Sequence, residues 1–306
     1  MRHSQEMTAG LRIVYRQLRR RLMETTGLFF IWRKAAVTLG IALLGMLAGC
    51  STGGAVRPGT GPAEGRGKDN AQAGGRPIDR QAYVCALKAD PPPVADGFDD
   101  DWSTVRGEFV MGDGNLTWGR DKYTGEDDLS GYIKLCYDAN YLYLLADVVD
   151  DVILVDGGIG MFNADHVELD FAPAIREGVE GPKGDDWRII GFSPGCVEES
   201  GDPLLDLEPE AYLVMPADID WGGIDVGASM TENGYLLEAR IPWHVLGVAP
   251  GQVKKGAVFG IEVHLSDSDT GNGQESMTTL DGRKWAGRRQ EQIPRFILGD
   301  TEGRAE

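Results

Sequence analysis

The residues best suited to chemistry in this sequence are aspartates gathered in three short segments, at residues 96–101, 147–151 and 267–269. Carboxylate oxygens that converge from turns are the ligands that Ca²⁺ prefers in proteins. None of these segments is an EF-hand loop. That loop requires glycine at its sixth position and glutamate at its twelfth, and a loop beginning at Asp267 has Asn272 and Thr278 there. Two interpretations stay open, structural calcium sites or solvated turns. The candidate calcium ligands are Asp96, Asp99, Asp150, Asp267 and Asp269.

Two other patterns suggest catalysis and fail on chemical grounds. Residues 191–195 match the Gly-x-Ser-x-Gly pattern of serine hydrolases, but Ser193 is followed by Pro194, which has no backbone N–H to donate to an oxyanion. Glu168 and Asp170 share one face of an expected strand, at a spacing compatible with the roughly 5 to 9 Å of a glycosidase pair. Nothing gives them the different environments that an acid and a base need. We therefore expect no enzyme, with a glycoside hydrolase as the least favoured alternative.

A haem-binding or electron-transfer protein is a further alternative, because some β-sandwiches hold haem through axial side chains. The chain has no Cys-x-x-Cys-His attachment motif, and single histidines on strands are more often structural. The available ligands are His166, His244, His264, Met161 and Met277.

The elements that must position all of these groups are short strands. Residues 132–137 and 141–149 are rich in aromatic and β-branched side chains and are separated by three residues, which predicts a β-hairpin. Only residues 99–105 and 243–246 suggest short helical turns. The pattern predicts an all-β domain, an antiparallel, jelly-roll-like β-sandwich of roughly ten strands. The other expected strands are residues 166–171, 187–192, 211–215, 235–241, 258–265 and 295–298.

The order of the local motifs resembles carbohydrate-binding module family 9. Members of that family open with an acidic Asp-Gly element that ends in tryptophan, and residues 96–102 have this form. The resemblance extends over essentially the whole domain, and it implies a β-sandwich that binds carbohydrate without cleaving it. The later motifs lie at residues 141–143, 150–151, 165–170, 234–243 and 259–269.

The resemblance also implies a binding site. In the family, two aromatic side chains enclose a sugar ring, and a glutamate and an arginine on neighbouring strands hydrogen-bond its hydroxyl groups. The matching aromatic positions are Phe162 and Trp285, and the matching polar positions are Glu168 and Arg188. Flat rings gain contact area on the C–H faces of a pyranose, while charged groups meet its rim. Phe162 replaces the usual tryptophan, and Gly282 stands where some members have asparagine, so the sugar itself is not defined.

These positions also have plainer interpretations. Glu168 would equally suit a solvated or calcium-bound acid, and Arg188 an ion-pair partner for one of the many carboxylates. Trp285 lies in a polar, Gly-rich loop and is harder to explain as a core residue. By contrast, Trp102, Trp187 and Trp243 occupy patterned segments and are expected to be buried.

The N-terminal part has the order of a secretory signal. An apolar run at residues 35–49 follows Arg33 and Lys34 and ends before Cys50, and residues 47–50 resemble a bacterial lipobox. The run is shorter than the roughly 20 residues of a spanning helix. The resemblance implies a lipid anchor at Cys50 and an extracytoplasmic protein, at the outer membrane if the cell is Gram-negative. The long lead also allows translation to start at Met23.

This organisation predicts four parts. Residues 1–49 form the lipoprotein signal sequence with its extended N-terminal region, and residues 50–80 form a flexible Gly/Pro-rich linker with almost no large apolar side chains. Residues 81–300 form the family 9-like β-sandwich, and residues 301–306 form a tail.

The charge balance limits the partners. Residues 50–306 carry 22 Lys and Arg against 46 Asp and Glu, a net charge of −24. Such a negative field repels phosphate backbones, so nucleic acid is excluded as a partner. The expected partner is a neutral oligosaccharide or polysaccharide, and the protein is expected to be a monomer.

The three cysteines Cys85, Cys136 and Cys196 allow one disulfide, with its pairing open, and Cys136 also suits a small core position. A scaffold or partner-binding module is the remaining alternative function.

Overall fold

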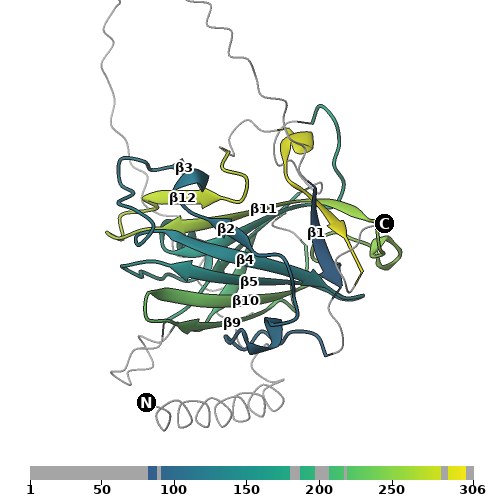
Figure 1. The fold of residues 1–306 in the computed structure, drawn as a ribbon, viewed down its shortest axis with the longest axis horizontal. Coiled ribbons are helices and arrows are strands. Elements are labelled where there is room, and N and C mark those ends of the chain that lie inside the picture. The colour runs from purple at the N-terminus through teal and green to yellow at the C-terminus, as the bar shows by residue number, and fades with distance from the viewer. Residues whose placement is uncertain are drawn as a thin grey trace, which may run out of the picture. The chain divides into compact units, whose positions relative to one another are not determined.

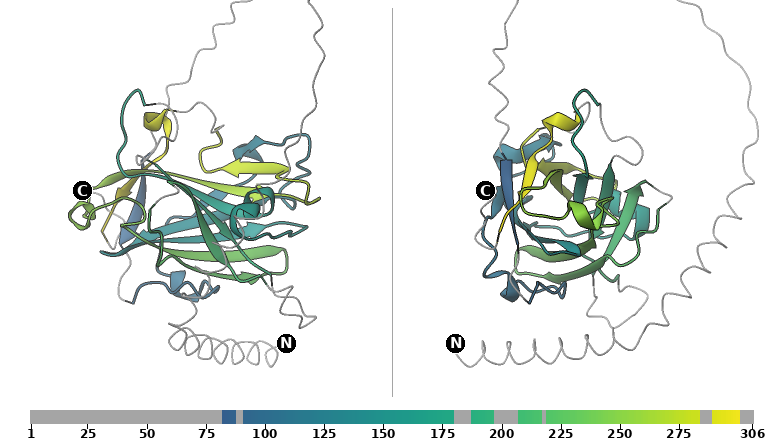
Figure 2. Two further views of the ribbon diagram at one scale, coloured as in Figure 1. Left: turned by 180° about the vertical axis from the view of Figure 1, so that it is seen from behind. Right: turned by 90° about the vertical axis from the view of Figure 1, so that its right-hand side faces the viewer.

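The computed structural model describes residues 82–87, 91–179, 187–196, 207–216, 219–283 and 289–300. These residues belong to one compact unit, Gly75–Glu306. They form thirteen strands in two layers, seen from three sides in Figures 1 and 2. The fold class predicted from the sequence is confirmed, with more strands than expected.

The first sheet follows the order β8 (Glu210–Met215), β7 (Arg188–Ser193), β6 (His166–Ala172), β11 (Val258–Asp267) and β13 (Arg295–Leu298). The strand β12 (Ser276–Thr279) pairs with the last residues of β11, and β3 (Leu116–Trp118) pairs with β12. The second sheet contains β2 (Phe109–Met111), β4 (Ser130–Tyr137), β5 (Tyr141–Val149), β10 (Gly234–Pro242) and β9 (Asp225–Met230). The strand β1 (Ala82–Leu87) pairs in parallel with both β13 and β4 and so joins the sheets. The other pairings are antiparallel.

All eight strands expected from the sequence are present within one or two residues of their predicted ends. The five that the sequence did not reveal are β1, β2, β3, β9 and β12. Three of these have only three or four residues, too few for alternation to stand out. The expected helical turn at residues 99–105 is the 3-10 helix η2 (Asp100–Trp102), and residues 243–246 form hydrogen-bonded turns instead of a helix.

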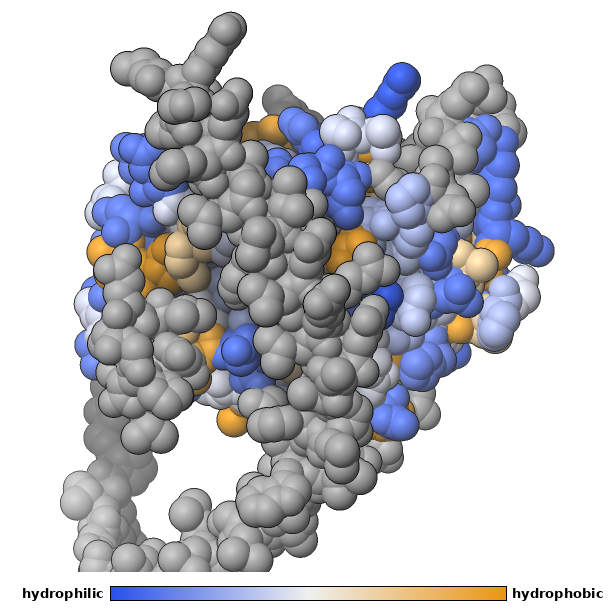
Figure 3. Space-filling view, turned by 90° about the horizontal axis from the view of Figure 1, so that it is seen from below, coloured by the Kyte–Doolittle hydropathy of each residue, from blue (hydrophilic) through white to orange (hydrophobic). Residues whose placement is uncertain are grey.

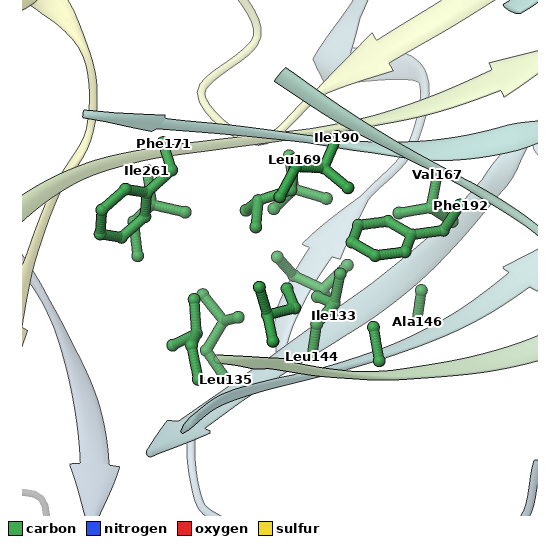
Figure 4. Packing of buried hydrophobic residues seen from close by; sticks show 14 of the residues in the cluster. Ile133, Leu135, Leu144, Ala146, Val167, Leu169, Phe171, Ile190, Phe192 and Ile261 are labelled. Carbon is green, nitrogen blue, oxygen red and sulfur yellow. The ribbon is translucent and has the colours of Figure 1, made fainter. Parts of the chain in front are cut away.

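The core lies between the two sheets. Along β6, Val167, Leu169 and Phe171 point inward, and they meet Ile133 and Leu144 from the opposite sheet (Figure 4). All of these side chains are fully buried. Each one gains roughly 1.5 to 3 kcal/mol by leaving water, which makes the alternation of these strands the main source of stability.

The opening Asp-Gly motif covers the outer face of the second sheet, and the carboxylate of Glu238 on β10 holds it there. One oxygen of Glu238 accepts hydrogen bonds from the backbone N–H groups of Asp96, Gly97 and Phe98, at 2.6 to 3.0 Å. The other accepts the indole N–H of Trp102 at 2.6 Å. Both Glu238 and Trp102 are 1% exposed. The motif is therefore explained by structure: it ties an N-terminal segment to a sheet.

Gly97 is required at this contact for two reasons. Its φ of +85° lies in the left-handed region that side chains disfavour. A Cβ at this position would also lie 2.6 Å from the carbonyl oxygen of Ala228 on β9.

The expected burial of Trp102, Trp187 and Trp243 is confirmed, because these residues are 1%, 1% and 3% exposed. Cys136 is buried beside Trp102 in the same cluster.

The remaining short elements are the 3-10 helices η3 (Asp113–Asn115), η4 (Gly158–Asn163), η6 (Pro250–Gln252) and η7 (Gln290–Gln292). Within the described ranges, no helix has the length and hydropathy needed to cross a membrane. On the face shown in Figure 3, hydrophobic residues form small separate areas among hydrophilic ones.

We predict that Glu238→Ala lowers the free energy of unfolding by about 3 kcal/mol or more, because it leaves several buried N–H groups without an acceptor. Urea denaturation of the purified domain measures this. The control is Glu232→Ala in an exposed turn, which should change stability by less than about 0.5 kcal/mol. Equal effects of the two substitutions would contradict the role given to Glu238.

Candidate functional site

The candidate carbohydrate site lies on the outer face of the first sheet. Glu168 on β6 pairs with Gly191 on β7 and with His264 on β11. Residues directly opposite in antiparallel strands share a face. Because Val167 and Leu169 fill the core, Glu168 and its paired neighbours point to the opposite side, away from the second sheet.

Phe162 reaches this face from η4, which immediately precedes β6. The ring of Phe162 lies over Gly191, since a Cβ built at Gly191 would be 2.6 Å from Cζ of Phe162 and 2.7 Å from Sδ of Met161. The edge of the ring also meets His166, with 4.9 Å between centroids. Phe162 is half-buried, so part of its surface remains open to a ligand. Glycine at 191 thus makes the space in which this aromatic side chain sits.

Glu168 lies next to this aromatic side chain and keeps 17% of its side chain exposed. Burial, with a further contribution from Asp170, raises the pKa of Glu168 to about 7. Its oxygen is 3.9 Å from Nδ1 of His264. Beside it, burial lowers the pKa of His166 to about 4, so the ring is neutral at pH 7 and its Nδ1–H donates to the carbonyl of Ala164 at 2.8 Å. Phe162 and Glu168 are therefore both neighbours of Gly191.

Arg188 is not brought to this site, which corrects the prediction. It pairs with Phe171, whose side chain is in the core, so Arg188 starts on the inner side of β7 and not on the side of Glu168. Its guanidinium donates to the carbonyls of Val245, at 2.8 Å, and Trp187, at 2.9 Å, and the residue is 6% exposed. Arg188 ties β7 to the turn after β10.

Tyr212 is an aromatic neighbour that the sequence reasoning missed. It lies on β8 directly opposite Gly191, so it shares the outer face with Phe162 and Glu168. It is half-buried, and its ring is 6.2 Å from that of Trp221. Tyr212 is identified by its pairing with Gly191, which is visible in the three-dimensional structure but not in the local sequence pattern.

Two predicted residues lie outside the described residues. These are Trp285, the second aromatic position, and Cys50, the expected lipid-bearing residue. Both predictions stand as made.

The residues considered for catalysis or haem binding are mostly buried and contact other side chains of the domain. Asp170 is fully buried against His264, with 3.1 Å between its oxygen and Nε2, so it cannot reach a glycan as a glycosidase acid would. Ser193 is 1% exposed on a strand. Nδ1 of His264 lies 3.3 Å from Sδ of Met277, so these two candidate haem ligands contact each other directly. His244 lies exposed in a turn after β10.

A second candidate site is a group of three buried aspartates, Asp150, Asp165 and Asp267. Their carboxylate oxygens lie within 4.8 Å of one another, and they come from the end of β5, the start of β6 and the end of β11. One oxygen of Asp150 and one of Asp267 have no hydrogen-bond partner among the described residues, and both residues are at most 3% exposed. Close, buried, partnerless carboxylates are the donor set that a divalent cation requires.

Asp165 is the member of this group that was not predicted. It accepts hydrogen bonds from the backbone N–H groups of Leu154 and Ser268, which fixes its position between two loops. Burial raises the pKa of Tyr235 well above its usual value, and the charges of the three carboxylates add to this shift. Asp165 opens the sequence motif at residues 165–170 that also contains Glu168, and this motif could have identified Asp165 as a candidate ligand.

A second acidic group adjoins the first and contains Asp128, Asp151 and Asp269. Asp269 and Asp128 both contribute to raising the pKa of Asp267. Asp269, which was predicted as a calcium ligand together with Asp150 and Asp267, therefore belongs to this second group. Asp96 and Asp99 are not part of either group: Asp96 accepts from the N–H of Phe98, and Asp99 precedes η2 on the second sheet.

Burial dominates the electrostatics of the first group. It raises the pKa of Asp150 to about 8, of Asp165 to about 9 and of Asp267 to about 7, and the neighbouring carboxylates add to each shift. The fold therefore favours the protonated forms near neutral pH unless a cation neutralises the charges.

Comparison with known proteins connects this geometry to a family. Residues 99–176 match the model of the family described as carbohydrate family 9 binding domain-like. The chain is also 24% identical over 197 residues to the exoglucanase XynX of Acetivibrio thermocellus. That alignment covers 63% of this chain but only 15% of the exoglucanase.

Two solved structures share the fold. Both are of a carbohydrate-binding module family 9 from Caldicellulosiruptor kristjanssonii, one with cellotriose and one with glucose, and each has a TM-score of 0.50 to this chain. They are 18% and 17% identical to it, and the matches cover 72% of this chain and 94% and 96% of theirs. The resemblance to family 9 that the motifs predict is confirmed.

We predict that, with a chelator present, the free energy of unfolding falls as the pH rises from 5 to 9. The pKa values of Asp150, Asp165 and Asp267 are higher in the folded state than the usual value near 4, so folding binds protons that are lost across this range. Urea denaturation at several pH values measures the slope. Asp165→Asn should flatten it, whereas Asp121→Asn, in an exposed turn, should not. A slope that stays unchanged in Asp165→Asn would contradict the assignment.

Proposed function

We propose that this domain binds carbohydrate without cleaving it, at the outer face of the first sheet beside Phe162 and Glu168. The observation that carries the proposal is the half-buried ring of Phe162, held over Gly191 next to a partly exposed carboxylate. An aromatic face with an adjacent hydrogen-bonding carboxylate suits a pyranose, which offers C–H groups on its faces and hydroxyls at its rim. The family match at residues 99–176 supports the same class of ligand.

The ring of Phe162 would stack on one face of the sugar, and Glu168 would accept hydrogen bonds from hydroxyl groups. Trp285 is proposed as the opposing aromatic side chain, on the resemblance to family 9 alone. Tyr212 lies on the same face and extends the aromatic surface beyond Gly191. A shallow site with few contacts supports an affinity on the order of micromolar to millimolar.

The proposal includes the protein's setting. The lipobox-like residues 47–50 support a lipid anchor at Cys50 and an extracytoplasmic location, and we propose that the protein is a monomer. Such a tether would let the domain hold a polysaccharide near the membrane. The cellotriose and glucose in the solved structures belong to those proteins, and for this chain they only indicate which sugars to try first.

We predict that Phe162→Ala raises the Kd for sugar at least tenfold, because it removes the stacking surface. The wild-type protein is first screened on a glycan array, and the strongest ligand is then titrated by calorimetry. Val258→Ala is the control, since Val258 is 43% exposed at the start of β11, whereas the residues of β11 that pair with Glu168 and His166 are His264 and Ser266 near its other end. If the wild type binds no sugar at millimolar concentration, or if Phe162→Ala binds as the control does, the proposed site is wrong.

We also propose that Asp150, Asp165 and Asp267 hold a structural calcium ion. The oxygens of Asp150 and Asp267 that have no partner among the described residues support this, since they face a third carboxylate within 4.8 Å. The ion would neutralise charges that burial otherwise penalises, and it would tie together the ends of β5 and β11 and the start of β6.

We predict that calcium raises the melting temperature of the chelator-treated protein by several degrees at pH 8 and by less at pH 5, where protons compete for the carboxylates. Differential scanning calorimetry with CaCl₂ or EDTA measures this. Asp267→Asn should lose most of the shift, and Asp121→Asn should keep it. If calcium leaves the melting temperature unchanged at both pH values, the proposed calcium site is refuted.

A further inference from the structure

Trp118 on β3 is a large aromatic side chain left in solvent. It is 48% exposed, although tryptophan is highly buried on average in folded proteins. The sequence pattern did not single it out, because β3 has only three residues. Tryptophan is enriched at binding surfaces, because its ring offers a large apolar area together with a polar N–H group.

The pairing of the strands places Trp118 on the same face as Phe162. Trp118 lies opposite Met277 on β12, and Met277 lies opposite Ser266 on β11. Ser266 in turn lies opposite His166 on β6, and His166 touches the ring of Phe162. The β3–β12 ladder shifts register between Met277 and Thr278, but Trp118 and Met277 are directly paired on one side of this shift. Directly opposed residues share a face, so one row of positions leads from Trp118 to the candidate sugar site.

The separation along this row is larger than one sugar ring. Three strand-to-strand steps lie between Trp118 and His166, and neighbouring strands are about 4.8 Å apart, so the two backbones are about 14 Å apart. Figure 1 shows β3 and β12 side by side beyond β11, at the margin of this sheet. A single pyranose at Phe162 cannot touch Trp118, whereas a chain of several units can reach both.

The surface between the two aromatic side chains offers hydrogen-bonding groups. Gln274, in the loop between β11 and β12, is half-buried and donates its amide N–H to the hydroxyl of Ser266 at 2.7 Å. The neighbouring Gly273 lies close to the exposed Asn163, with 3.9 Å between a Cβ built at Gly273 and Oδ1 of Asn163. Side-chain amides both donate and accept, as sugar hydroxyls do.

The backbone on either side of Trp118 is held firmly. The hydroxyl of Thr117 donates to the carbonyl of Met277 at 3.3 Å. Gly119 has a φ of +78°, and a Cβ there would lie 2.0 Å from the carbonyl oxygen of Glu275, so the chain packs directly on the next loop. The exposed ring therefore projects from a fixed base, which reduces the entropy lost when it stacks on a ligand.

We propose that Trp118 forms a second stacking position for the same glycan, so that the domain binds an oligosaccharide of several units along the row from Phe162 to Trp118. This inference rests on the proposed carbohydrate function and specifies its substrate class. The first sugar lies at Phe162 and Glu168, the chain crosses Gln274, and a distant unit stacks on Trp118.

The test compares ligands of graded length. Oligosaccharides of one to six units from cellulose, xylan and β-1,3-glucan are titrated by calorimetry into the full chain and into Trp118→Ala, Trp118→Phe and Val110→Ala. Val110 is the control because it is 74% exposed on β2 of the other sheet. We expect Trp118→Ala to raise the Kd of the longest bound oligosaccharide about tenfold and to leave that of the monosaccharide unchanged. Trp118→Phe, which keeps a flat ring, should retain most of the affinity for long chains.

Other outcomes separate this inference from the proposed function. If the wild type binds short and long chains equally, or if Trp118→Ala binds all lengths as Val110→Ala does, the second stacking position is refuted while sugar binding stands. If Trp118→Ala weakens every length alike, Trp118 acts on the primary site and the extended path is wrong. If no sugar binds the wild type, both proposals fail.

Discussion

The two-residue period of β6 and β11 is the constraint on which the rest of the structure depends. On β6 it sends Val167 and Leu169 into the core and turns His166 and Glu168 to the outside. The burial that stabilises the fold therefore also fixes the faces of the candidate site. A shift of one residue in β6 would bury Glu168 and expose Leu169, so the core protects the site against such a slip.

Two features position the described residues of the site: the alternation of β6 and the absence of a side chain at Gly191. Phe162 can approach β7 because Gly191 has no side chain there. The row from Trp118 to His166 then follows from the pairing of four strands. Among the described residues, Phe162, Glu168 and Trp118 reach this face from a short 3-10 helix and two strands.

The sequence predicted what depends on local pattern. The long alternating strands and the neighbouring pair of Phe162 and Glu168 could be found because strand period and chain proximity determine them. Arg188 was assigned to the wrong side, because the faces of β7 depend on its register with β6 and not on its own short sequence. Tyr212 and Trp118 become neighbours of the site only through pairing with other strands. The same holds for Asp165, which needs loops from three places in the chain to meet Asp150 and Asp267.

The strand β1 has a consequence for how the domain can be cut. It pairs with β13 on one side and β4 on the other, so it closes the seam between the sheets. Proteolysis or truncation beyond Ala82 would leave two unpaired strand edges, and such edges recruit other chains into aggregates. A shortened form of the protein that is to stay soluble must therefore begin before this strand.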